Sequence, residues 1–97
     1  MKQAQATLRW LSPDEGGRSE PPTGPSYSTV ARFKEQRVDW TTEAWSLVVE
    51  FEVPPNDRQM VASVRFLVED APEELLHAGS EFELLEGTRL VAEGTVL

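Results

Sequence analysis

His77 is the only histidine in the chain, and imidazole is the side chain best suited to proton transfer near neutral pH. Ser80 follows three residues later, so a nucleophile and base pair supported by a nearby acid can be drawn. His77 lies in a polar, irregular segment, however, where a solvated loop histidine is the simpler interpretation. A single histidine also excludes paired imidazoles and multi-histidine metal sites.

Carboxylates are the other groups that could carry chemistry, and several are adjacent in the sequence: Asp14-Glu15, Glu69-Asp70 and Glu73-Glu74. Glycosidase-type catalysis needs two carboxyl groups on opposite sides of a cleft, one with a raised pKa. Neighbours on an exposed turn do not provide that arrangement. Asn56-Asp57 with Glu50 or Glu52 offers oxygen ligands, but the Asp-x-Asp-x-Asp-Gly spacing of a calcium loop is absent. We therefore expect no catalytic residue, metal site or cofactor.

Composition narrows the class of protein further. The 97 residues fit a single domain, 1–97, and 39% of them are apolar, enough for a modest core. There is no cysteine, which excludes disulfides and thiolate metal sites and agrees with a cytoplasmic location. Neither a signal peptide nor an apolar run of roughly 20 residues is visible, so no membrane association is expected.

The formal net charge is −8, from 17 acidic and 9 basic residues. Such a surface repels phosphate backbones and anionic lipid, so nucleic acid is a disfavoured partner. Solubility is the simplest explanation of the charge. A partner protein with a basic patch is the more specific one.

The elements that would position these side chains have a period of two. Apolar and polar residues alternate in six segments, which predicts half-buried strands over Lys2–Leu11, Tyr27–Phe33, Trp45–Val53, Met60–Val68 and two short strands around Glu86-Gly87 within Phe82–Leu97. The large side chains available for the core are Trp10, Phe33, Trp40, Trp45, Phe51, Phe66 and Phe82.

The connections between these segments contain little helix. Ser12–Ser26 holds four prolines and three glycines and predicts a long loop. Pro72–Leu76 predicts at most one helical turn. A last strand left unpaired would expose a sticky edge, so we expect an all-β, six-stranded antiparallel closed β-barrel.

Two local motifs are similar to a known domain. Glu15-Gly16-Gly17-Arg18 follows the first strand, and Phe82–Arg89 precedes Val91 and Gly94 in the last one. Together they resemble the carboxy-terminal barrel, the third domain, of translation elongation factor Tu. Pro55-Asn56-Asp57 stands where that family has Pro-Gly-Asp. The similarity spans nearly the whole chain, although the terminal turn has one glycine fewer and 33–52 matches poorly.

The resemblance implies a binding role. In that family the nucleotide sits in the first domain, and this sequence has no Gly-x-x-x-x-Gly-Lys-Ser/Thr loop, so no nucleotide is expected. The third domain contacts the T stem of aminoacyl-tRNA, which the match places at Glu86 and Gly87, and it packs on the nucleotide domain through Gly16, Gly17 and Glu83. The net charge predicts that the tRNA contact is lost. The charge of Glu83 fits a dry interface poorly.

The sequence thus predicts a non-enzymatic binding or interaction module, with another protein as the partner. Its two candidate surfaces are the Glu15–Arg18 loop and the Glu83–Thr88 turn, with the partner-binding residues Glu15, Gly16, Gly17, Arg18, Glu83, Glu86 and Gly87. One alternative is a translation-linked RNA-binding accessory protein. A second is a small ligand-binding barrel or hydrolase, in which His77 would lie beside an acid in a deep pocket.

Overall fold

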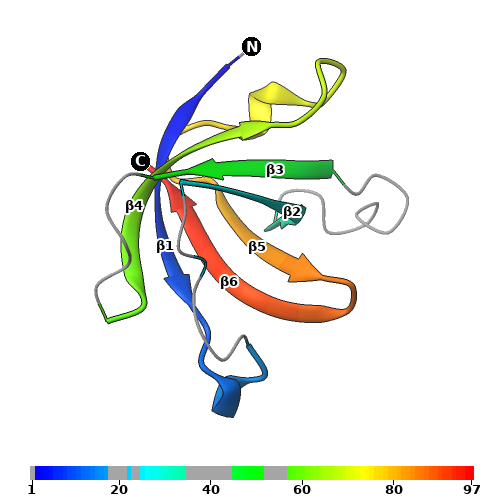
Figure 1. Cartoon of the computed structure of the whole chain (residues 1–97). Coiled ribbons are helices and arrows are strands. Elements are labelled where there is room, and N and C mark those ends of the chain that lie inside the picture. Colours follow the sequence, from blue (N-terminus) through cyan, green and yellow to red (C-terminus); the bar gives the residue numbers. More distant parts are fainter. Residues whose placement is uncertain (1, 18–21, 23–24, 35–44, 52–56) are drawn as a thin grey trace.

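Six antiparallel strands close into a barrel in the computed structural model, which describes residues 2–17, 22, 25–34, 45–51 and 57–97 (Figure 1). The strands are β1 (Ala4–Trp10), β2 (Ser26–Phe33), β3 (Trp45–Glu50), β4 (Gln59–Phe66), β5 (Glu81–Glu86) and β6 (Arg89–Val96). They follow the order β1-β4-β3-β2-β5-β6 around the barrel, and β6 pairs again with β1. The predicted closed six-stranded barrel is confirmed.

Two short 3₁₀ turns lie wholly within the described residues, η1 (Pro13–Glu15) and η3 (Glu73–Leu75), and Lys34 also has 3₁₀ geometry. The second lies within the predicted single turn at Pro72–Leu76. Because all neighbouring strands are antiparallel, η1 and the β5–β6 turn lie at one end of the barrel and η3 lies at the other (Figure 1). Within the described part of the chain, no helix is long and apolar enough to cross a bilayer.

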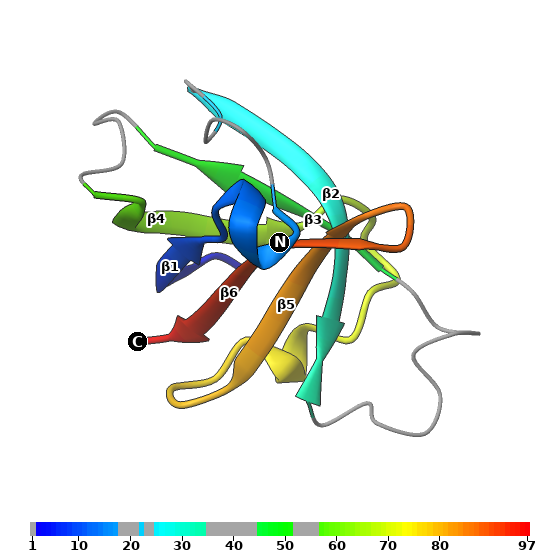
Figure 2. The same ribbon diagram turned by 90° about the horizontal axis from the view of Figure 1, so that it is seen from below.

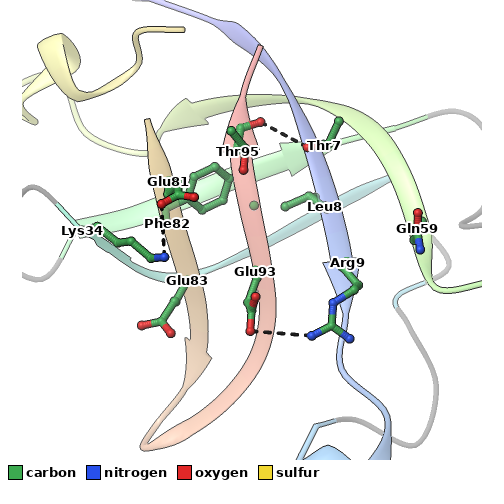
Figure 3. A pocket seen from close by; sticks show the side chains of 11 residues that line it. Thr7, Leu8, Arg9, Lys34, Gln59, Glu81, Phe82, Glu83, Glu93 and Thr95 are labelled. Atoms are coloured by element: carbon green, nitrogen blue, oxygen red, sulfur yellow. Dashed lines mark hydrogen bonds and ion pairs between the residues drawn. The ribbon is translucent and has the colours of Figure 1, made fainter. Parts of the chain in front are cut away.

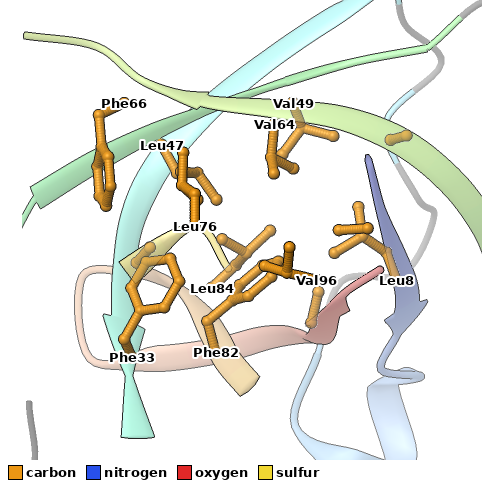
Figure 4. Packing of buried hydrophobic residues seen from close by; sticks show 14 of the residues in the cluster. Leu8, Phe33, Leu47, Val49, Val64, Phe66, Leu76, Phe82, Leu84 and Val96 are labelled. Carbon is orange, nitrogen blue, oxygen red and sulfur yellow. The ribbon is translucent and has the colours of Figure 1, made fainter. Parts of the chain in front are cut away.

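Every second side chain faces the interior, which the strands surround when the barrel is viewed from below (Figure 2). Phe33 lies between Phe66 and Phe82, with ring centroids 5.6 and 5.1 Å away (Figure 4). Five of the seven predicted core residues are buried, namely Trp10, Phe33, Phe51, Phe66 and Phe82. Trp45 is partly buried against the same cluster. Trp40 lies outside the described residues.

The alternation departs from the prediction at several places. In β3, Val48 was predicted to face outward but is buried, as are Leu47 and Val49 on either side of it. β3 ends at Glu50, so it is shorter than the predicted run to Val53; Phe51 donates its N–H to Pro25, and Val53 lies outside the described residues. β4 ends at Phe66, and Val68, predicted to face inward, is 46% exposed because the chain bends out of the sheet there. In β6 the register shifts by one residue, which buries both Val91 and Ala92.

Packing of the Phe82 ring inside the barrel depends on Gly94. Phe82 is directly opposite Gly94 in the ladder, and its ring occupies the space that a side chain at 94 would fill. A Cβ atom at Gly94 would lie 2.4 Å from Phe82 Cζ and 2.8 Å from Leu8 Cδ2. The glycine therefore lets one large ring fill the barrel where β5, β6 and β1 meet.

The η1 end of the barrel is closed by Trp10 and Tyr27. Their rings pack edge to face with centroids 5.5 Å apart, and Trp10 Nε1 donates to Met60 Sδ at 3.0 Å. The β2–β5 ladder begins only at Val30, so side chains continue it towards this end: Thr29 Oγ1 donates to the Leu85 carbonyl, and the Tyr27 hydroxyl donates to Glu86.

Adding one methyl group at Gly94 should therefore destabilise the barrel. We expect Gly94→Ala to lower the free energy of unfolding by about 1–3 kcal/mol, because Phe82 must leave its position. Chemical denaturation of Gly94→Ala, Phe82→Leu and the double variant measures this. The double variant should lose less stability than the sum of the two single variants. Additive losses would show that Phe82 and Gly94 do not share this space.

Candidate interaction surface

Glu15 ends η1 and fixes it to β1. Its carboxylate accepts the Ser12 backbone N–H at 3.1 Å and Arg9 Nη1 at 3.0 Å. The Ser12 N–H, followed by the Arg9 hydrogen bond, lowers the pKa of the Glu15 carboxyl. The same hydrogen bond to Glu15 is the largest factor raising the pKa of Arg9. Glu15, which the sequence analysis predicted to contact a partner, thus holds η1 against β1.

The two glycines after Glu15 are required by the backbone conformation of the turn. Gly16 has φ +90°, in the left-handed region that glycine tolerates best. A Cβ on Gly17 would lie 2.2 Å from the Leu11 carbonyl oxygen, so no side chain fits there. These two predicted binding residues therefore shape the turn. Arg18, the fourth residue of that predicted surface, lies outside the described residues.

Glu83 lies in the middle of β5 and is held from β2. Arg32 donates to Glu83 Oε1 from Nε, at 2.8 Å, and from Nη2. Cross-strand register places Glu83 opposite Glu93 on β6, and Glu93 opposite Arg9 on β1. Arg9 Nη2 lies 3.7 Å from Glu93 Oε1. Arg32, Glu83, Glu93, Arg9 and Glu15 thus form one charge row across the outer surface.

The centre of this charge row is a like-charge pair. Two carboxylates directly opposite each other on neighbouring strands repel. Figure 3 shows how the pair is accommodated: Glu93 turns towards Arg9, and Glu83 turns away from Glu93. Each acid therefore depends on the arginine on its own side. Glu93 is the less tightly held of the two, since its side chain is 50% exposed and that of Glu83 is 21% exposed.

A groove of about 340 Å³ runs over this part of the barrel (Figure 3). Leu8, Phe82 and Gly94 form its floor. Its polar lining consists of three acids (Glu81, Glu83 and Glu93), two basic residues (Arg9 and Lys34), two threonines (Thr7 and Thr95) and Gln59. Lys34 Nζ pairs with Glu81 at 3.1 Å. The groove thus carries one more negative than positive side chain and is open to solvent along the outer sheet.

The structure brings together only part of the two predicted surfaces. Glu83 lines the groove, and Glu15 joins it through Arg9. Glu86 lies outside the groove lining and accepts the Tyr27 hydroxyl, which makes it part of the η1-end closure. Gly87 has φ +64° and forms the β5–β6 turn. The turn conformation of Gly87 was expected from the sequence, whereas the contact of Glu86 with Tyr27 was not.

Four charged groove residues were not singled out from the sequence: Arg9, Lys34, Glu81 and Glu93. A signal for Arg9 was present, because it belongs to the outward row of the first strand. Its pairing with Glu93 depends on the register between the two terminal strands, which local patterning does not fix.

His77 and Ser80 differ sharply in accessibility. His77 is exposed, whereas Ser80 is 2% exposed and its buried hydroxyl has no hydrogen-bond partner among the described residues. A nucleophile in that position is shielded from substrate. No cluster of three or more metal-ligating side chains occurs among the residues that the structure describes.

Searches against protein-family models and against curated proteins gave no match to this chain. The surface must therefore be interpreted from its own chemistry.

The Glu15 contacts predict a pH dependence. Because the folded-state pKa lies below the ordinary value of 4.5, ionised Glu15 stabilises the fold at neutral pH, and that stabilisation is lost as pH falls through the folded pKa. NMR titration of the Glu15 carboxyl measures the shift directly.

Two variants separate the causes of this shift. Arg9→Gln should raise the Glu15 pKa towards 4.5 more than Ser12→Ala does, because Ser12→Ala keeps the backbone donor. A larger effect of Ser12→Ala would contradict the assigned order of contacts.

Proposed function

We propose that this barrel is a non-enzymatic, cytoplasmic interaction module that binds another protein through the groove over β5, β6 and β1. The observation that carries the proposal is the half-exposed Glu93 at the centre of the charge row. Within the described part of the chain, it faces a like charge on β5 and its ion pair with Arg9 on β1 is long, at 3.7 Å. A basic side chain from a partner would supply the missing positive charge between Glu93 and Glu83.

The rest of the groove suits the same kind of partner. Glu81 is half exposed and Lys34 is its counterion, so the groove offers a second exchangeable ion pair one step along the strands. Thr95 lies opposite Glu81 and Thr7 lies opposite Thr95, so their hydroxyl groups continue this second row across β6 and β1. Exposed ion pairs contribute little by themselves, about 0–1 kcal/mol, so exchanging them for contacts with a partner has a small cost.

The resemblance to the third domain of elongation factor Tu supports this proposal only in part. It implies a closed antiparallel barrel that works by binding, and such barrels host many unrelated functions. The tRNA contact that it implies falls at Glu86 and Gly87. The charge of the chain opposes a phosphate-binding role, so we favour a basic protein partner over RNA.

A defined basic probe tests the groove. We expect hexalysine, added to isotopically labelled protein, to shift the amide NMR signals of Thr7, Glu93 and Thr95, with binding that weakens as salt is added. Glu93→Gln should weaken binding about two- to fivefold, since one exposed charge pair is worth up to about 1 kcal/mol.

Glu74→Gln is the matched control, because it removes the same charge from an exposed position in η3, at the other end of the barrel. It should leave hexalysine binding nearly unchanged. Equal losses from the two variants would show attraction to the net charge alone and would overturn the groove as the binding site.

A further inference from the structure

We propose that the partner binds this groove with an arginine, whose guanidinium bridges Glu83 and Glu93. This assignment rests on the proposed function, since it names the side chain that would lie between the two acids. Arginine and lysine carry the same charge, but they differ in hydrogen-bond geometry. The order of charges in the charge row, the contacts of Arg9 and the oxygens of the two acids together favour arginine.

Positive and negative side chains alternate along the charge row except at one place. From β2 to η1 the order is Arg32, Glu83, Glu93, Arg9 and Glu15. Neighbours in this order form ion pairs, apart from Glu83 and Glu93, which are directly opposite each other on β5 and β6. One cation between these two acids would complete the alternation and offset their repulsion.

Arg9 shows how a guanidinium of this chain joins two acids. Its Nη1 donates to Glu15 Oε2 at 3.0 Å, and its Nη2 lies 3.7 Å from Glu93 Oε1. Separate nitrogens of one planar group thus contact carboxylates on η1 and β6. A guanidinium can do this because it holds several N–H donors in a fixed fork, whereas an ammonium is a compact point charge. An arginine from the partner would repeat the arrangement between Glu93 and Glu83.

Glu83 and Glu93 each have one oxygen that the described residues do not use. Within the described part of the chain, both acids make their hydrogen bonds and ion pairs through Oε1: Arg32 donates to Glu83 from Nε and Nη2, and Arg9 pairs with Glu93. Oε2 of each carboxylate is left to accept from a partner. The two side chains turn apart (Figure 3), so this donor must reach in two directions at once. A planar fork meets that requirement better than an ammonium does.

Two peptides of equal length and charge test the assignment. We expect hexaarginine to bind the isotopically labelled protein about three- to tenfold more tightly than hexalysine does at the same salt concentration, because the bridge adds a charge-assisted hydrogen bond. NMR titration measures both affinities. The side-chain carboxyl carbon signals of Glu83 and Glu93 should shift with a single midpoint as hexaarginine is added.

Removing either acid of the bridge should remove the preference for arginine. In Glu83→Gln and in Glu93→Gln we expect the affinities of the two peptides to differ by about twofold or less. Glu81→Gln is the matched control, since it removes the same charge from the same strand and groove but lies outside the charge row. It should weaken the binding of both peptides and leave the ratio of their affinities unchanged. Circular dichroism and thermal unfolding verify that each variant is folded.

Equal affinities of hexaarginine and hexalysine for the wild-type chain, both reduced by Glu93→Gln, would overturn the bridging arginine and leave the groove as the binding site. A preference for hexaarginine that persists in Glu83→Gln would also overturn it, because the advantage would then be a general property of arginine peptides. If neither peptide shifts the signals of the groove, the proposed function fails as well.

Discussion

Pairing of the two terminal strands is the constraint on which the rest of this molecule depends. β6 must pair with β5 on one side and with β1 on the other, and Gly94 allows both because it leaves room for the Phe82 ring next to Leu8. Once the sheet is closed, the direction of every side chain on these strands is fixed. The outer surface is therefore a consequence of how the core packs around Gly94.

The outer side of β1 changes character along its length. Arg9, near η1, lies between Glu15 and Glu93 and belongs to the charge row. Gln5, two outward positions away, lies between Leu97 and Ser63. The one charged side chain of β1, Arg9, thus lies near the η1 end of the strand.

The sequence predicted the barrel because period-two alternation is a local property, and six such segments leave few architectures without an exposed edge. The shortfalls have physical causes. Val68 left the sheet at a bend, Val91 was buried by a bulge, and the pairing of Arg9 with Glu93 depends on register between strands more than 80 residues apart. Glu15 and Glu83 were named through a family resemblance. Their structural partners, Arg9 and Arg32, became evident only in three dimensions.

Cross-strand nuclear Overhauser effects between β1 and β6 test the closed barrel most directly. The account predicts backbone contacts for Ala6 with Val96, Leu8 with Gly94 and Trp10 with Ala92, together with slow amide exchange along both strands. Contacts within β5–β6 and β1–β4 but none between β1 and β6 would mean an open sheet. That result would remove the charge row and the groove together.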